Sequence, residues 1–255
     1  MPADALVSTL DVGSIAIWAF WLFFAGLIIY LRKEDKREGY PLESERSDYV
    51  KVVGWPAMPE PKTFLLPHGQ GTRQVPRPQE PETVNATPTE PWPGAPLQPN
   101  GDPMLARVGP GACPKRDDLP DLTFEGENKI VPLRVAEGFS IASEDGNPVG
   151  MEVLGADDQK GGVITDCWVD RSEPQIRYLE LSVTGGKKVL LPINFARISK
   201  ANRKVKVDAL LGSQFANVPV LANPDRVTLR EEDLITSYYG GGKLYATPDR
   251  TEPFL

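Results

Sequence analysis

The chain has 255 residues, enough for one or two domains, and its net charge of -7 argues against a nucleic-acid-binding surface. Its two cysteines, Cys113 and Cys167, are far apart and lack CxxC spacing, which excludes a readable disulfide framework or zinc motif. Free thiols in a reducing compartment are therefore expected.

The first predicted element is a transmembrane helix over residues 12–31, where no residue is charged. At this length the helix extends about 30 Å, the thickness of the hydrocarbon core of a bilayer. Acidic residues precede the span and basic residues follow it, so residues 1–11 are expected outside and the bulk of the chain in the cytoplasm. A cleaved signal peptide is disfavoured because its basic residues would come before the apolar run.

Aromatic and basic residues of this segment are candidate membrane contacts. Trp18 and Trp21 lie mid-span on nearly the same helix face, which is deeper than an interfacial belt. Packing against neighbouring transmembrane helices is the expected role of these two residues. Tyr30, Arg32 and Lys33 are predicted to anchor the helix at the cytoplasmic interface.

Residues 32–115 form a juxtamembrane and proline-rich segment that holds 15 of the 26 prolines between Pro56 and Pro114. Such density excludes long helices and favours extended chain. A disordered tether is one interpretation. Apolar residues such as Trp55, Phe64 and Trp92 favour the other, an extended strap docked on a partner protein.

Residues 116–255 are predicted to form a mainly-β domain, a small antiparallel barrel with a C-terminal helix. The alternating run 176–183, a Thr184-Gly-Gly turn and the run 187–191 indicate a β-hairpin. Further strands are expected near 163–169 and 205–211. Thr228 and Glu231 form a capping-box pattern for a helix over about 229–239, which Gly240-Gly-Gly is expected to end.

The chain offers little for catalysis on its own. Its single histidine, His68, lies in a loop, where a surface role is favoured over ligation, and no phosphate-loop, nucleophile-elbow or HExxH motif is present. Asp166, Asp170 and Glu173 crowd the end of one predicted strand and the turn after it. A solvated acidic turn is the favoured interpretation, with mutual repulsion raising at least one pKa.

The sequence resembles the H subunit of the photosynthetic reaction centre of purple bacteria along nearly its whole length. Each matching motif is weak alone, but their shared order around one span and a proline-rich strap is specific. The motifs are Arg37-Glu-Gly-Tyr-Pro-Leu42, Pro61-Lys-Thr-Phe-Leu-Leu-Pro-His-Gly69, Gly101-Asp-Pro-Met104, Asn128-Lys-Ile130, Trp168-Val-Asp170, Leu190-Leu-Pro192, Val227-Thr-Leu229, Glu231-Glu-Asp233, Gly241-Gly242 and Tyr245-Ala246.

The resemblance implies a structural subunit, not an enzyme, in the bacterial inner membrane, with a periplasmic N-terminus and a cytoplasmic barrel of the PRC type capping the L and M subunits. It implies that this chain binds no cofactor and that bacteriochlorophyll, bacteriopheophytin, quinones and non-haem iron belong to L and M. A cytochrome subunit, antenna proteins and membrane lipids are further candidate partners.

The resemblance also implies a proton route to the secondary quinone. Asp170 and Glu173 match surface acids at its start, and Arg177 and Glu232 match a charged cluster further in. Some relatives carry two histidines where this chain has Glu125 and Glu127. A carboxylate buffers poorly at pH 7, so an uptake patch that is more negative and binds zinc weakly is expected.

Two other functions stay open from the residues alone. One is a membrane-tethered PRC-barrel binding module that recruits a soluble partner, and the other is an anchored enzyme that works by itself.

Overall fold

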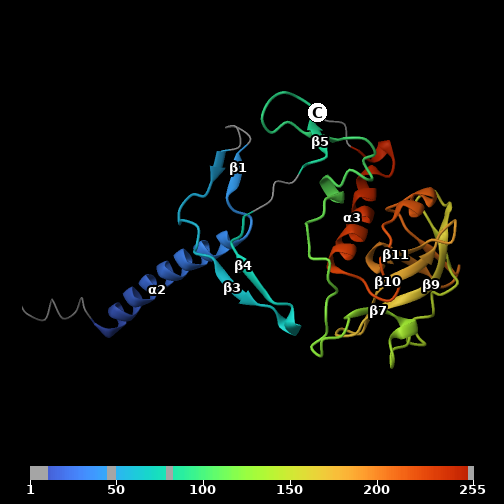
Figure 1. The fold of residues 1–255 in the computed structure, drawn as a ribbon, viewed down its shortest axis with the longest axis horizontal. Coiled ribbons are helices and arrows are strands. Elements are labelled where there is room, and N and C mark those ends of the chain that lie inside the picture. Colours follow the sequence, from blue (N-terminus) through green and yellow to red (C-terminus); the bar gives the residue numbers. More distant parts are fainter. Residues whose placement is uncertain (1–10, 45–49, 79–82, 252–255) are drawn as a thin grey trace, which may run out of the picture. The chain divides into compact units, whose positions relative to one another are not determined.

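The structure is a computed structural model that describes residues 11–44, 50–78 and 83–251. The chain divides into two compact units, Met1–Glu82 with Pro91–Gly94 and Thr83–Glu90 with Ala95–Leu255 (Figure 1). Each unit is described by itself.

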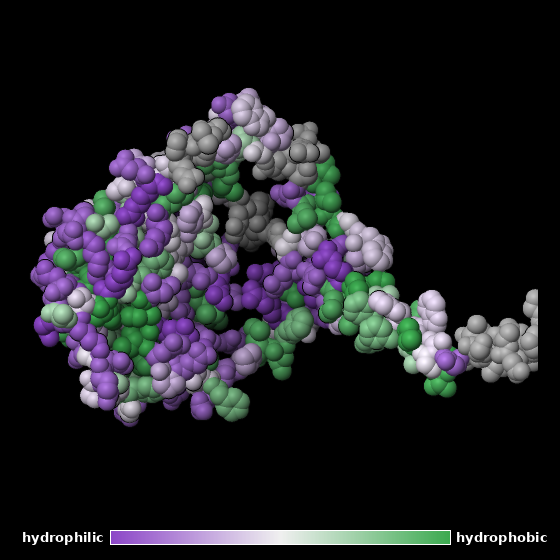
Figure 2. Space-filling view, turned by 180° about the vertical axis from the view of Figure 1, so that it is seen from behind, coloured by the Kyte–Doolittle hydropathy of each residue, from purple (hydrophilic) through white to green (hydrophobic). Residues whose placement is uncertain are grey.

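The first unit begins with helix α2 (Val12–Glu34), which extends about 35 Å. The Asp11 side chain caps it by accepting the backbone N–H of Ser14 at 2.6 Å. No residue within α2 is buried, and apolar side chains are visible on the face of the helix seen in Figure 2. Among the described residues it is the one helix long and apolar enough to cross a membrane. It continues past the predicted end at residue 31 because charged residues can extend a helix beyond the apolar core.

A buried lysine holds the chain that follows α2. Lys36 lies in a short 3₁₀ helix (Asp35–Arg37), and only 2% of its surface is exposed. Its ammonium donates to the carbonyls of Val53 at 2.6 Å and Gly54 at 3.1 Å, and also to that of Pro56. Three carbonyls replace the water that a buried ammonium needs, so the segment around residue 54 is tied to the base of α2.

The described part of residues 42–99 contains three two-stranded antiparallel hairpins. They pair β1 (Leu42–Ser44) with β2 (Val50–Val52), β3 (Lys62–Leu65) with β4 (Thr72–Val75), and β5 (Ala86–Pro88) with β6 (Leu97–Pro99). Two-stranded ribbons tolerate proline because every strand keeps an open edge. Arg37 ties the second hairpin to α2 by pairing with Glu34 at 2.8 Å and donating to the carbonyl of Val75 at 3.1 Å.

The second unit is built on one seven-stranded sheet in the described part of the chain. Its strands are β7 (Ile130–Pro132), β8 (Glu152–Leu154), β9 (Lys160–Asp170), β10 (Gln175–Ser182), β11 (Lys188–Pro192), β12 (Arg197–Ser199) and β13 (Lys204–Lys206). The strand order is β11-β10-β9-β8-β13-β12, and β7 also pairs with β9. All pairs are antiparallel except β8 with β13. The fold class is as predicted, with this one parallel pair added and β13 shorter than expected.

The predicted hairpin is present as β10 and β11, but both faces of β10 are covered. Leu179 and Leu181 lie in the main hydrophobic core, as the alternation indicates. Tyr178 and Glu180, on the alternate positions, are only 6% and 3% exposed. They are covered because Glu232 of the C-terminal helix and Arg134 contact them.

The C-terminal helix α3 (Leu229–Tyr245) begins with the predicted capping box, in which Thr228 and Glu231 bond each other's backbone N–H. The prediction that Gly240-Gly-Gly ends the helix is wrong. A Cβ at Gly240 would lie 2.8 Å from the carbonyl oxygen of Pro110, and one at Gly242 would overlap that of Ala209. Because glycine has no Cβ, the backbone of other segments can approach the helix closely at these positions, and the helix continues through them.

Candidate functional site

Asp170, the last residue of β9, is fully buried, and both oxygens of its carboxylate accept hydrogen bonds. One carboxylate oxygen accepts the backbone N–H groups of Ser172 at 2.9 Å and Glu173 at 3.1 Å. The other accepts from the guanidinium of Arg177 at 3.1 Å and lies 3.8 Å from the ammonium of Lys129. Burial would raise the pKa of Asp170, but these donors outweigh it and the pKa is lowered.

A bulge in β10 brings Arg177 to this carboxylate. The pairing of β10 with β9 shifts between Ile176 and Tyr178, so Arg177 is the extra residue of the bulge. Its guanidinium lies 3.5 Å from Glu173, whose side chain is 67% exposed. Arg177 therefore joins an exposed acid to a buried one.

The prediction of a solvated acidic turn is wrong for two of its three acids. Asp170 is buried. Asp166, which lies earlier in β9, forms an ion pair with Arg134. The expectation that mutual repulsion raises a pKa fails for Asp170, since backbone amides and cations surround it more closely than other acids do. Glu173 is the member that faces solvent.

Glu232 lies in the first turn of α3 and faces β10. The phenol of Tyr178 donates a hydrogen bond to its carboxylate at 2.6 Å. Burial raises the pKa of Glu232, and the negative charges of Asp121 and Asp233 raise it further, against the opposing effect of Tyr178 and Arg177. Asp233 carries a buried carboxylate oxygen without a hydrogen-bond partner in the described part of the chain.

The two glutamates at the histidine positions differ in their contacts. Glu127 pairs with Arg171 at 2.7 Å, and Glu125 is an exposed residue of the same turn. The turn leads to Lys129, which lies 3.3 Å from Asp121 and adjoins Asp170. Sequence analysis missed Asp121, Lys129 and Tyr178. Lys129 lies in the quoted Asn128-Lys-Ile motif, but nothing in the pattern indicated which side chain it would meet.

We refer to the charged and polar side chains around Asp170, together with the Tyr178–Glu232 pair that Arg177 influences electrostatically, as the Asp170 cluster. Its members are Asp121, Lys129, Asp170, Glu173, Arg177, Tyr178 and Glu232. Four come from β9, β10 and the turn between them, one from α3, and two from the segment before β7. The cluster therefore contains three kinds of carboxylate. Glu173 is exposed, Asp170 is buried with a lowered pKa, and Glu232 is half-buried with a raised pKa.

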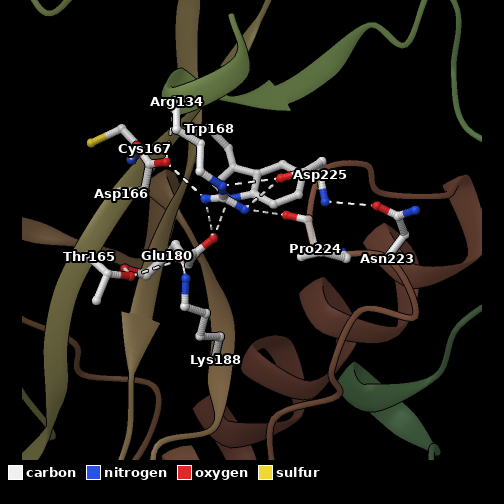
Figure 3. A network of polar contacts seen from close by, with 10 residues as sticks. All are labelled: Arg134, Thr165, Asp166, Cys167, Trp168, Glu180, Lys188, Asn223, Pro224 and Asp225. Carbon is white, nitrogen blue, oxygen red and sulfur yellow. Dashed lines mark hydrogen bonds and ion pairs between the residues drawn. The ribbon is translucent and has the colours of Figure 1, made fainter.

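A second group of charges, which we call the Arg134 network, lies on the hairpin formed by β9 and β10 (Figure 3). The Arg134 guanidinium contacts Asp166 at 2.9 Å, Glu180 at 2.9 Å and Asp225 at 3.0 Å, and also the carbonyl of Pro224. Lys188, the fifth member, lies 2.7 Å from Glu180. Burial would raise the pKa of Glu180, but Lys188 and Arg134 outweigh it and lower the pKa. No sequence signal indicated this network.

The remaining predicted residues are the tryptophans of α2 and the two cysteines. Trp18 and Trp21 are 70% and 55% exposed, and with Ser14 and Ile17 they line a shallow hollow on α2. Both cysteines are free, and burial raises the pKa of Cys167 to about 12. Within the described residues, no group of three or more histidine, cysteine and acidic side chains is arranged to hold a metal.

Two known families match parts of the chain. Residues 4–135, more than half of the chain, match the family described as the photosynthetic reaction centre H-chain N-terminal region. Residues 141–214 match the PRC-barrel domain, which includes Asp170, Glu173 and Arg177. The resemblance drawn from the ordered motifs is thus confirmed. The chain belongs to the family of photosynthetic reaction centre H chains, subunits of a complex with other reaction centre polypeptides.

Proposed function

We propose that this chain caps the L and M subunits on the cytoplasmic side, shields their quinone sites and supports proton uptake to the secondary quinone. The Asp170 cluster is the observation that carries the proposal. Its carboxylates divide two tasks between them. Asp170, whose pKa is lowered, stays ionised and attracts protons, and Glu232, whose pKa is raised, can hold one.

The proton is proposed to arrive at Glu173, the exposed acid of the cluster. Arg177 contacts both Glu173 and Asp170 and keeps the two carboxylates from repelling each other. Glu232, reached through the Arg177–Tyr178 side of β10, then passes the proton towards the partner subunits. Pigments, quinones and iron are proposed to be held by those subunits.

Exposed apolar surface supports the proposed partners. All faces of α2 are uncovered, and the aromatic face with Trp18 and Trp21 is proposed to pack against the L and M helices. Trp55, Leu65 and Trp92 in the proline-rich segment are 75%, 83% and 58% exposed, as expected for a strap docked on another subunit. The basic residues after α2 support a periplasmic N-terminus in the bacterial inner membrane.

Purification in mild detergent tests the assembly. A near-infrared-absorbing complex should co-purify with the chain. A colourless soluble partner would favour the tethered binding module instead, and turnover by the isolated chain would favour an enzyme.

Flash-induced proton uptake by the purified complex tests the relay. Asp170→Asn alone should slow uptake little, because Glu173 still provides a surface acid. Combining it with Glu173→Gln should slow uptake roughly tenfold, about 1.4 kcal/mol in activation free energy. Glu152→Gln is a matched control, since Glu152 pairs only with Lys160 on the exposed side of β8 in the described structure. A wild-type rate in the double variant would contradict the relay.

A further inference from the structure

Tyr178 occupies the point where the sheet meets the acidic first turn of α3. It is 6% exposed and lies in the middle of β10, paired with Trp168 on β9 and Pro192 on β11. Its backbone is therefore fixed by two neighbouring strands. Its hydroxyl donates to the carboxylate of Glu232 at 2.6 Å.

The Tyr178 hydroxyl is a constant donor. Burial and the adjacent Glu232 carboxylate raise its pKa, so the phenol keeps its proton at any physiological pH. A hydroxyl that keeps its proton needs a hydrogen-bond acceptor, and the acceptor here is one carboxylate oxygen of Glu232. The other oxygen remains to take up and release a proton.

The surroundings make this single contact important. The charged groups that act on Glu232 are Arg177 from β10, Asp121 from the segment before β7, and Asp233 from α3 itself. Two of the three are acids, so they favour the protonated form. Within the described contacts of Glu232, Tyr178 is the direct hydrogen-bond donor to the carboxylate, and such a bond favours the ionised form.

We propose that Tyr178 is a positioning residue of the proton relay, which holds Glu232 against β10 and keeps its proton exchangeable. This inference rests on the proposed function, because it assigns a means of tuning to a residue of the same cluster. Without the phenol, Glu232 would retain its proton more tightly and lose its fixed direction. It would then release the proton more slowly to the next group.

The test uses infrared pH titration of the intact complex in the dark, with Glu232→Gln to identify the Glu232 carboxyl band. Tyr178→Phe should raise the pKa of Glu232 by about one unit, a tenfold increase in proton affinity. It should also shift the pH profile of flash-induced proton uptake in the same direction. Tyr238→Phe is the matched control, since Tyr238 is equally buried and its hydroxyl donates to the backbone carbonyl of Gln214 at 2.9 Å.

A Glu232 titration that is the same in Tyr178→Phe as in the native complex would overturn the inference. So would an equal shift in Tyr238→Phe, because the effect would then be a general loss of packing. The dark titration does not depend on quinone chemistry. If Glu232→Gln left proton uptake unchanged while the titration still shifted in Tyr178→Phe, the relay itself would be wrong and the coupling of Tyr178 to Glu232 would stand.

Discussion

Glu180, which is buried on β10, and Glu232, which is half-buried on α3, have pKa values that move in opposite directions. Burial acts on both and favours the protonated form. Glu180 has two cationic partners, Arg134 and Lys188, so its pKa is lowered. Glu232 has a phenol as its direct partner and acids nearby, so its pKa is raised. The nature of the partner, not burial, decides which carboxylate can exchange a proton.

This comparison assigns different roles to the two groups. The Arg134 network ties β9 and β10 to residues 224–225, just before the capping box of α3, with direct ion pairs for each of its carboxylates. The Asp170 cluster leaves one carboxylate without a cation in contact. The first arrangement stabilises a fold, and the second supports a change of protonation.

The largest expected effect concerns the Arg134 network. Arg134→Leu removes the main cation from the buried Glu180 and should lower the free energy of unfolding by about 3 kcal/mol. Thermal or denaturant unfolding of the purified protein in detergent measures this loss. Arg197→Leu is the control, because Arg197 is 77% exposed where it pairs with Asp208 and should cost less than about 1 kcal/mol. Equal losses in the two variants would contradict a stabilising role.

The second prediction uses pH to separate the two kinds of carboxylate. Asp170 has a lowered pKa, so its stabilising contribution is complete above the unfolded pKa of about 3.9 and is lost as pH falls through the folded value. Glu232 has a raised pKa, so its contribution is complete below about 4.3 and is lost as pH rises through the folded value.

Asp170→Asn should therefore flatten the stability curve on the acid side, and Glu232→Gln should flatten it above pH 4.3. Each effect should be on the order of 1 kcal/mol per unit of pKa shift. The measurement is the midpoint of denaturant unfolding between pH 3 and 8. The comparison would fail if both variants flattened the same side of the curve.

The smallest expected effect is at the exposed turn that leads to Lys129. Glu125 and Glu127 lie where the resemblance implies histidines in some family members, and Glu127 is already paired with Arg171. Micromolar zinc should consequently inhibit reduction of the secondary quinone only weakly, and Glu125→His with Glu127→His should increase the inhibition. Strong inhibition of the native complex would show that the carboxylates bind the metal well.

Much of the architecture was predictable because it depends on local pattern. The uncharged run of α2, the Thr184-Gly-Gly turn between β10 and β11, and the Thr228–Glu231 capping box each act over a few residues. The end of α3 was not predictable in this way. Its glycines looked like a stop signal, and only their close approach to Pro110 and Ala209 shows why they lie inside the helix.

The sequence by itself determined the long apolar helix, the mainly-β class of the second unit, the family, and the positions of the acids. Only the tertiary structure decided which acids meet cations, which face solvent, and which meet a phenol. Asp166 and Asp170 lie four residues apart in the same strand, but one pairs with Arg134 and the other with Arg177. The physical reason is that a carboxylate's protonation depends on the donors that the folded chain brings to it, whether 32 residues away, as Arg134 is from Asp166, or through a strand bulge, as for Asp170, and local pattern encodes neither.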